Sequence, residues 1–402
     1  MKCRHCKTKI NLNFIDLGFS PPSNEYVNLI DYNKPEKYYP LKVSTCHKCF
    51  LVQTEDYVDA DDLFHSNYAY FSSTSKFFLK HAENYVNHIE DFLKLNKSSF
   101  VCELASNDGY LLKNFIKKNI PCLGIEPTKS TAEVARKNKI PVVNKFFSYD
   151  LSKEITKKYK KSDLVIANNV LAHVPDINNF VKGIANLLNK RGVLTVEFPH
   201  LLNLMKLNQF DTIYHEHFSY LSLITVRTIF NKFKLSVFKV EEINTHGGSL
   251  RVYASKDTSF KVCGSVSKLI EEEIKYGLNN RSIYKSFSEK IIKIKLSFLK
   301  FVTEEKIKNK KICAYGAAAK GNTLLNYFGI KNDIIDAVFD NAKSKQGKFM
   351  PGSKIPIVSP SKFMKYNPDI LIIFPWNIRE EIETLVRSKN TKVKLIDIRD
   401  FH

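Results

Sequence analysis

Hydrophobic and polar positions alternate along residues 75–255 as short apolar runs separated by longer amphipathic segments. Short apolar runs bounded by turn-forming residues are typical of buried strands, and residues 110–118 and 129–138 space their apolar positions at helical intervals. The predicted strands are 99–104, 121–125, 163–167 and 192–198. Strands that alternate with helices predict a parallel sheet with helices on both faces.

A second series of this kind follows residues 262–306, an amphipathic stretch rich in Lys, Ile and Glu that predicts one or two helices. The series consists of strands at 311–315, 335–339, 369–374 and 392–396, a tight loop at 316–321 and a helix at 322–328. The first 70 residues hold cysteine pairs and short β-like runs such as 38–43. We therefore expect an α/β protein with a small N-terminal domain (1–70), a central Rossmann-like domain (71–258) and a C-terminal Rossmann-like domain with leading helices (259–402).

Composition narrows the class of protein. The 402 residues are 44% apolar and 12% aromatic, which indicates a folded chain of several domains. The sequence contains neither an apolar run long enough to span a membrane nor a signal-peptide pattern, so we expect a cytoplasmic protein without a membrane partner. The net charge of +21 comes mostly from scattered Lys, which favours a phosphate-bearing small molecule over nucleic acid.

Four of the eight cysteines form two Cys-x-x-Cys pairs, Cys3/Cys6 and Cys46/Cys49. Two such turns supply four sulfurs for a tetrahedral Zn²⁺, and four thiolates close the coordination shell, so the predicted zinc is structural. The alternative is two unrelated pairs of free thiols. The other cysteines lie in apolar surroundings and are predicted to be buried: Cys102, Cys122, Cys263 and Cys313.

A cofactor loop is predicted where the first strand of the central domain ends. The candidates for cofactor binding there are Glu103, Ser106, Asn107, Asp108 and Gly109, and Glu126 at the end of the next strand suits a ribose diol. A nicotinamide dinucleotide would also fit such a loop, but the G-x-G-x-x-G pattern is absent. An acidic, glycine-poor loop favours S-adenosylmethionine, whose sulfonium is positive. Asn168 and Asn169 follow the third strand and are expected to face the same cofactor.

Residues suited to proton transfer follow the third and fourth strands, at the same edge of the sheet. They are His173 in the segment 167–176, and Tyr214, His215, Glu216 and His217 in the segment 210–220. Histidine titrates near neutral pH, and Tyr and His can donate to a developing oxyanion. Alternatives are a metal site at His-Glu-His, or ordinary packing. The upstream run 67–75 is rich in hydroxyl groups and could cap a helix or close over the site.

Together these motifs resemble bacterial sugar C-methyltransferases along essentially the whole chain. The resemblance rests on the paired cysteines, Tyr68-x-Tyr70-x-Ser72-Ser73, the 103–109 loop, 124–127, Asn169-Val170-x-Ala172-His173-Val174, Tyr214-His215-Glu216-His217, 244–251 and 315–322. It implies a nucleotide-linked 4-keto-sugar that is methylated at carbon 3, with S-adenosylmethionine as the methyl donor. It also implies His217 as the base, with Tyr68, His173, Tyr214 and Glu216 around the sugar. Ala105 stands where the family often has Gly.

The sugar's diphosphate needs positive charge and backbone donors. The loop from Gly316 to Gly321, with Lys320 and the helix start at Asn322, is the candidate, and His246 and Arg251 could contribute. A tight turn with packing alanines is the alternative. Other functions left open are an O- or N-methyltransferase acting on a nucleotide-sugar, a zinc-dependent nucleic-acid-binding regulator and a catalytically silent scaffold. We expect a monomer or weak dimer.

Overall fold

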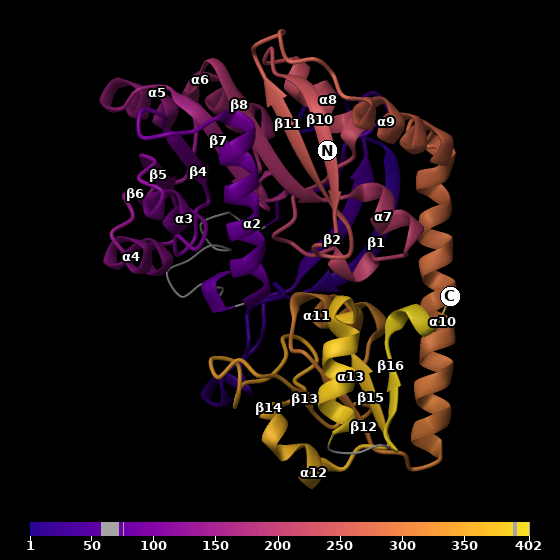
Figure 1. Ribbon diagram of the computed structural model, residues 1–402. Helices are drawn as coiled ribbons and strands as arrows, with labels where there is room; N and C mark the ends of the chain where they lie inside the picture. Colours follow the sequence, from indigo (N-terminus) through magenta and orange to yellow (C-terminus); the bar gives the residue numbers. More distant parts are fainter. Residues whose placement is uncertain (58–71, 75, 389–391, 402) are drawn as a thin grey trace.

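The computed structural model describes residues 1–57, 72–74, 76–388 and 392–401, and it contains three sheets (Figure 1). The first sheet is antiparallel and has the strand order β1-β2-β3-β9. Its strands are β1 (Leu12–Ser20), β2 (Tyr39–Thr45), β3 (Val52–Thr54) and β9 (Ser219–Tyr220). The last strand comes from the middle of the chain, so the N-terminal sheet is completed by a segment that lies far away in sequence.

The central sheet has seven strands in the order β10-β11-β8-β7-β4-β5-β6. The five strands from β6 to β8 run parallel, as predicted for the four of them other than β6, whereas β11 and β10 form an antiparallel hairpin at one edge. The strands are β4 (Val101–Leu104), β5 (Cys122–Ile125), β6 (Val142–Val143), β7 (Ser162–Asn168), β8 (Leu188–Pro199), β10 (Ser236–Ile243) and β11 (Ser249–Ser255).

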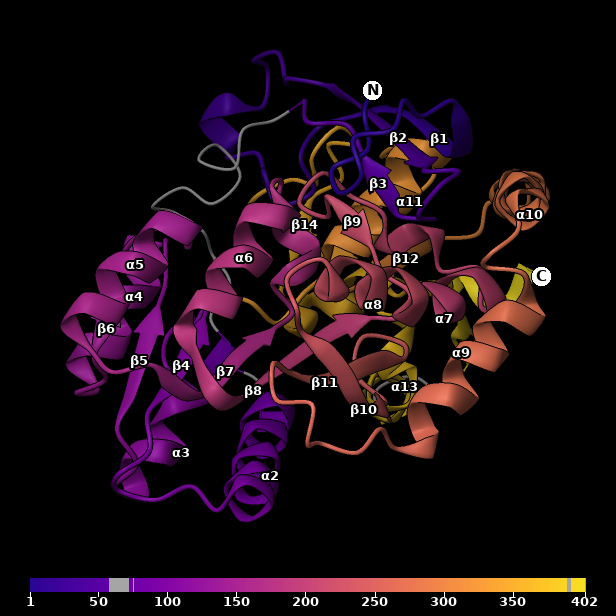
Figure 2. The same ribbon diagram turned by 90° about the horizontal axis from the view of Figure 1, so that it is seen from above.

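Helices cover both faces of the central sheet. Alternate strand residues point to opposite sides, and the apolar residues on each side are buried by helices. On one face, Cys102 and Leu104 pack with α5 (Tyr149–Lys158), α6 (Ile177–Leu187) and α8 (Leu223–Asn231). On the other face, Val101 packs with α2 (Lys76–Leu93) and α3 (Leu112–Lys117), and Figure 2 shows the two layers on either side of the sheet. The other helices of this part are α4 (Lys129–Lys137), α7 (Leu201–Lys206) and α9 (Gly264–Tyr276).

The third sheet is parallel, with the order β14-β13-β12-β15-β16. Its strands are β12 (Ile312–Tyr315), β13 (Val338–Phe339), β14 (Ile357–Val358), β15 (Ile370–Ile373) and β16 (Lys394–Ile396), and its helices are α11 (Ala319–Phe328), α12 (Phe363–Tyr366) and α13 (Arg379–Arg387). The strand order reverses between β12 and β15, and ligands of open α/β sheets bind at such a switch point. The carboxyl ends of β12 and β15 therefore frame a candidate binding crevice.

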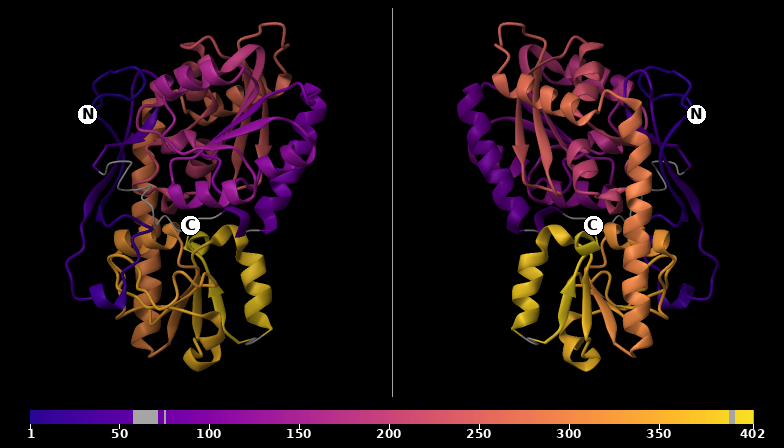
Figure 3. Two further views of the ribbon diagram at one scale, coloured as in Figure 1. Left: turned by 90° about the vertical axis from the view of Figure 1, so that its left-hand side faces the viewer. Right: turned by 90° about the vertical axis from the view of Figure 1, so that its right-hand side faces the viewer.

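The amphipathic stretch forms two helices, α9 and α10 (Arg281–Ile307), separated at Gly277, whose φ of 100° suits glycine. The long helix α10 runs beside the upper and lower parts of the molecule in Figures 1 and 3. Its buried stripe includes Phe287, which stacks on Phe14 of β1 at 4.6 Å between ring centroids. This helix thus joins the N-terminal sheet to the core of the C-terminal domain.

Two predictions about local structure were wrong. Cys263 is exposed, because it occupies the N-cap position of α9 at the end of a surface loop. The helix predicted from Asn322 begins at Ala319, so Lys320 lies in its first turn. Position 321 of this helix needs glycine, because a Cβ there would lie only 2.3 Å from the ring of Phe374. None of the helices in the described ranges combines the length and apolar character needed to cross a bilayer.

Candidate active site and zinc centre

The two cysteine pairs converge on one point. The Sγ atoms of Cys3 and Cys49 lie 3.6 Å apart, those of Cys6 and Cys46 lie 3.5 Å apart, and all four fall within 4.8 Å of one another. Tetrahedral zinc with Zn–S bonds near 2.3 Å requires S–S edges of about 3.8 Å, so this donor set fits a structural Zn²⁺. His5 contacts Asn178 through its Nδ1 and is not needed as a ligand.

The cofactor loop at the end of β4 has an unusual backbone. Ala105, Asn107 and Gly109 have φ values of 55°, 50° and 80°, so three of the five residues 105–109 are left-handed. A side chain at Gly109 would lie 2.1 Å from Ile140, which requires glycine there. Ala105 is not a glycine, so its positive φ is disfavoured and the residue carries local backbone strain.

Three buried carboxylates surround this loop. Glu126 accepts hydrogen bonds from the backbone amides of Asn107, at 2.8 Å, and Thr128, at 2.9 Å. Glu103 Oε2 and Asp108 Oδ1 are buried and have no hydrogen-bond partner within the described part of the chain. Burial raises the pKa of Glu103 and, more weakly, that of Glu126. These acceptors fit a ligand that brings both positive charge and N–H or O–H donors, as S-adenosylmethionine does.

The neighbouring candidates differ in orientation. Ser106 packs against β5, since a Cβ at Gly124 would lie 2.4 Å from its Oγ, so its side chain faces the sheet. Asn107 Oδ1 and Asp108 Oδ2 accept the backbone amides of Ser72, at 3.0 Å, and Ser73, at 3.1 Å. These two bonds connect the loop to the 3₁₀ turn Ser72–Thr74, which precedes α2 in the sequence. The remaining candidates, Asn168 and Asn169, are half-buried at the carboxyl end of β7.

His217 lies at the centre of the predicted proton-transfer cluster. Its ring centroid is 4.1 Å from that of Tyr214 and 4.7 Å from that of His173. Its Nδ1 lies 3.0 Å from the carbonyl oxygen of Thr212, which can only accept, so Nδ1 carries the proton and Nε2 has the lone pair. Burial lowers the pKa of His217 well below its usual value, and lowers that of His173 to about 4. Both imidazoles are therefore neutral at pH 7.

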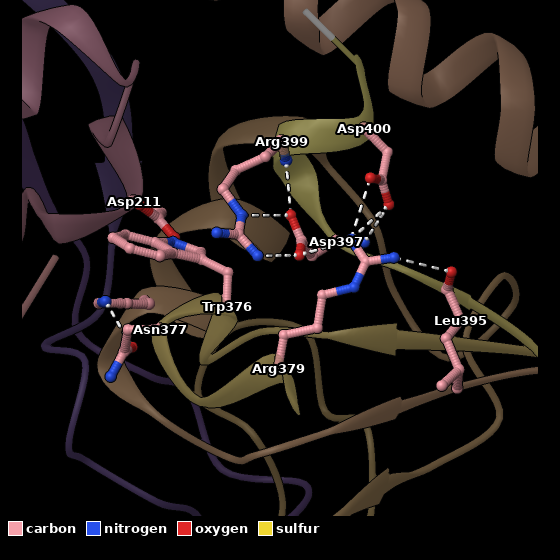
Figure 4. A network of polar contacts seen from close by, with 9 residues as sticks. Asp211, Trp376, Asn377, Arg379, Leu395, Asp397, Arg399 and Asp400 are labelled. Carbon is pink, nitrogen blue, oxygen red and sulfur yellow. Dashed lines mark hydrogen bonds and ion pairs between the residues drawn. The ribbon is translucent and has the colours of Figure 1, made fainter. Parts of the chain in front are cut away.

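The C-terminal domain holds the beginning of the loop of residues 211–218 that carries this cluster. Trp376 Nε1 donates to Asp211 Oδ2 at 2.7 Å, and the Thr323 hydroxyl donates to the carbonyl of Ile213 at 2.7 Å. Figure 4 shows the indole of Trp376 directed at Asp211 from the loop after β15. Burial raises the pKa of Asp211 to about 6.

The N-terminal sheet and the central domain hold the end of the 211–218 loop. Thr54 of β3 donates its hydroxyl to the carbonyl of His217 and its amide to that of Phe218, both at 3.2 Å. The amide of Phe218 donates to the carbonyl of Ala172, next to His173, at 2.8 Å. Because β9 follows directly, the N-terminal sheet fixes where His217 lies. All three domains therefore contribute to one loop.

The other two residues of the Tyr-His-Glu-His turn point elsewhere. Glu216 is buried and accepts from Asn24 Nδ2 at 2.5 Å. His215 packs edge-on against Tyr39 of β2, with 6.1 Å between ring centroids, so the prediction that it joins the proton-transfer cluster was wrong. His215 and His217 thus diverge, and the described residues contain no metal-ligand cluster besides the four cysteines. Tyr68 lies outside the described residues.

Lys320 lies in the switch-point crevice of the C-terminal domain. Its Nζ lies 3.7 Å from the ring centroid of Trp376 and donates to Asn377 Oδ1 at 2.9 Å. Burial lowers the pKa of Lys320 to about 8, although Asp211 opposes this shift. Gly316, after β12, packs closely against Pro375, after β15, because a Cβ at position 316 would lie 2.4 Å from Pro375. Asn322 instead donates to the carbonyl of Ser23 and connects α11 to the N-terminal domain.

The last two substrate candidates lie on the side of α2. Arg251 donates its Nε to Glu197, at 2.7 Å, and its Nη1 to Glu241, at 3.2 Å, so carboxylates of the chain already balance its charge. Arg251 and His81 line a cavity of about 240 Å³. His246 has a φ of 52°, lies 5.4 Å from the ring of Phe78, and has its pKa lowered to about 4 by burial and by Lys320.

Sequence reasoning missed Thr54, Asp211 and Trp376. A buried threonine in a three-residue strand carries no local signal. Trp376 is the single tryptophan of the chain, which marks it as unusual without indicating a partner 165 residues away.

An acidic loop at the carboxyl edge of a mostly parallel seven-stranded sheet indicates an S-adenosylmethionine-dependent methyltransferase. The four converging cysteines add a structural zinc site. Three family models match consecutive parts of the chain: "Putative zinc binding domain" at residues 3–64, "Methyltransferase domain" at 78–240 and "C-methyltransferase C-terminal domain" at 244–395. C-methyltransferase NovU of Streptomyces niveus is 31% identical over 95% of this chain and 91% of its own length. The chain therefore belongs to the C-methyltransferase family that its sequence motifs resemble.

Solved structures also match. Protein PH0226 of Pyrococcus horikoshii is 13% identical, with a TM-score of 0.39 over 47% of this chain and 95% of its own. Magnesium protoporphyrin IX methyltransferase of Synechocystis, with S-adenosylmethionine bound, is 13% identical, with a TM-score of 0.35 over 51% of this chain and 100% of its own.

Proposed function

We propose that the protein transfers a methyl group from S-adenosylmethionine to carbon 3 of a nucleotide-linked 4-keto-sugar through an enolate. The observation that carries this proposal is the position of His217: a neutral imidazole with Nδ1 bonded to Thr212, beside His173 and Tyr214. A base in that state can accept a proton at Nε2. Such a weak base can remove a carbon-bound proton only when an adjacent ketone delocalises the resulting charge.

The roles of the surrounding residues follow from their chemistry. Nε2 of His217 takes the proton from carbon 3, and the electron pair of the broken C–H bond moves to the ketone oxygen. Tyr214, Tyr68 and His173 are the proposed donors to this oxyanion. Glu216, whose carboxylate accepts from Asn24, is proposed to support the loop of residues 211–218 beside the sugar. When bound, S-adenosylmethionine would supply a methyl group on a positively charged sulfur: the enolate carbon 3 would form the new C–C bond as the S–CH₃ bond breaks, and the neutral thioether S-adenosylhomocysteine would be the leaving group. Glu103, Asn107, Asp108, Gly109 and Glu126 are proposed to hold it, with Ser106, Asn168 and Asn169 shaping the pocket.

Binding of the substrate's diphosphate is proposed to change the pKa of His217. Lys320 and Gly316, at the switch-point crevice, are its proposed binding residues, supported by the N-terminus of α11. Burial is the main cause that lowers the pKa of His217, and the charge of Lys320 lowers it further. A diphosphate that neutralises Lys320 removes this second contribution, so substrate binding raises the pKa of His217 and makes it a stronger base.

His246 is proposed to border the sugar, since it lies on the turn between β10 and β11, and the next residue of this turn, Gly247, packs against Trp376. Arg251 is retained as a wall of the neighbouring cavity, because its guanidinium is already paired with Glu197 and Glu241. The proposed location is the cytoplasm, where four thiols remain available for zinc.

The test is incubation of the enzyme with methyl-labelled S-adenosylmethionine and a panel of nucleotide-linked sugars with and without a 4-keto group. Label should enter only the keto-sugars, and NMR should place the new methyl on carbon 3. A ketone at carbon 4 acidifies the C–H bonds of carbons 3 and 5 alike. A methyl on carbon 5 would therefore support the enolate mechanism but show that carbon 5, not carbon 3, is methylated. A methyl on oxygen or nitrogen, or equal labelling of sugars without the ketone, would refute the proposal.

A further inference from the structure

Arg4 lies inside the first zinc knuckle, between Cys3 and Cys6, and its side chain is directed away from the metal site into the protein. The residue is only 7% exposed. Asp56 forms a bidentate ion pair with its guanidinium. Zinc binding by the four cysteines does not require a buried arginine side chain at this position, so the contacts of Arg4 point to another task.

These contacts reach both segments that carry the candidate catalytic histidines. Arg4 Nη1 donates to the carbonyl of Pro175, two residues after His173, at 2.9 Å. Arg4 Nη2 donates to the carbonyl of Thr54 at 2.8 Å. Its Cζ lies 5.0 Å from the ring centroid of Phe218, the residue after His217.

The bonds close a circuit. Thr54 is bonded to the backbone of His217 and Phe218, and Phe218 is bonded to Ala172, which precedes His173. From Arg4 the circuit therefore runs through Thr54 and Phe218 to residues 172–175, and from Pro175 back to Arg4. The planar fork of a guanidinium can bond two carbonyls and a carboxylate at once, which the ammonium of a lysine cannot match.

We propose that Arg4 is a positioning residue that holds the rings of His173 and His217 in register, so that the zinc knuckle sets the geometry of the base. The proposal rests on the function proposed above for its catalytic meaning, but the geometry can be tested without substrate. Loss of the fork should loosen the packing of Phe218 and admit water beside His217. The titratable groups that face His217 are His173, His246, Lys320, Tyr214 and Tyr220, and this test changes none of them.

The experiment compares the zinc-loaded wild type with Arg4→Met, Arg4→Lys and the control Lys9→Met, an exposed cation of the same knuckle. Zinc content, thermal unfolding and S-adenosylmethionine affinity are measured first. The ¹⁵N signals of the histidine rings are then titrated by NMR, assigned with His173→Gln and His217→Gln. In both Arg4 variants, zinc content and cofactor affinity should stay within about twofold of wild type. Their His217 titration should move up towards the ordinary histidine range, and kcat should fall on the order of 10- to 100-fold.

Arg4→Lys keeps the charge, so a shift shared by both variants assigns the effect to geometry; if Arg4→Met fails to fold, Arg4→Lys decides alone. Histidine titrations identical to wild type in a folded, zinc-loaded Arg4→Lys would overturn the proposal. The same holds if zinc content, stability and cofactor affinity fall together with activity, because Arg4 would then only stabilise the knuckle. Because the ring titrations need no substrate, a failure of the proposed sugar chemistry would leave their outcome unaffected.

Discussion

Replacing His217 by Asn tests the proposed base directly. The substitution removes the Nε2 lone pair and the ring that lies 4.1 Å from Tyr214 and 4.7 Å from His173. Asn still has an N–H group with which to approach the carbonyl of Thr212. The loop of residues 211–218 keeps its other bonds from Thr54, Thr323 and Trp376, so the fold should survive.

The structure separates the expected effect on catalysis from the effect on stability. A general base accelerates proton transfer about 10²- to 10⁴-fold, so its loss should raise the barrier by roughly 3–5 kcal/mol. Weakening one neutral hydrogen bond and one ring contact should cost only about 1–2 kcal/mol of folding free energy. S-adenosylmethionine affinity should be unchanged, because His217 belongs to a different segment from the 103–109 loop.

The assay is exchange of the substrate's α-proton with D₂O, followed by NMR, together with kcat and calorimetric binding of S-adenosylmethionine. His215→Asn is the matched control: it makes the same change two residues earlier, in a ring that packs on Tyr39. Exchange should disappear in His217→Asn and persist in His215→Asn. Undiminished exchange in a folded, cofactor-binding His217→Asn would show that another group removes the proton.

Three further predictions concern charge and backbone. The pKa of Lys320 is lowered to about 8, so its charge is present below that pH and is lost above it; kcat/KM for the nucleotide-sugar should fall as pH rises through about 8, and Lys320→Met should remove this limb of the pH profile. Burial raises the pKa of Asp211 from 3.8 to about 6, so the wild type loses folding free energy as pH rises from about 4 to 6 and this carboxyl ionises. Asp211→Asn, which still accepts from Trp376, should therefore be more stable than wild type by roughly 3 kcal/mol at pH 8 and equally stable near pH 4. Thermal unfolding at the two pH values measures this difference, and equal stability at both would contradict the assignment. Ala105→Gly should relieve the strain of a φ of 55°, by at most about 1 kcal/mol, and this gain should appear either as tighter binding of S-adenosylmethionine or as a higher Tm. Weaker binding together with a lower Tm would show that the methyl group of Ala105 is needed for packing.

The sequence alone predicted the features that depend on local patterns. The Cys-x-x-Cys spacing indicated a closed zinc site, and Cys3, Cys6, Cys46 and Cys49 do converge. The rhythm of apolar runs predicted the parallel strands of both Rossmann-like sheets, because burial on both faces of a parallel strand imposes a continuous apolar stretch. The sequence also indicated the acidic loop after β4 and its glycine, because the need for acidic side chains and the need for a positive φ each act on a few consecutive residues.

Tertiary structure decided how these parts are joined. The two-residue strand β9 has no pattern of its own, yet it completes the N-terminal sheet and fixes His217. In the sequence Arg251 is a plausible phosphate ligand, but in the fold Glu197 and Glu241 already balance its charge. His215 and His217 share a tripeptide but face different elements. Hydrophobic periodicity reports only which face of an element is buried, whereas hydrogen bonds and ion pairs connect residues that are far apart in sequence, so their partners are set only when the three domains pack together.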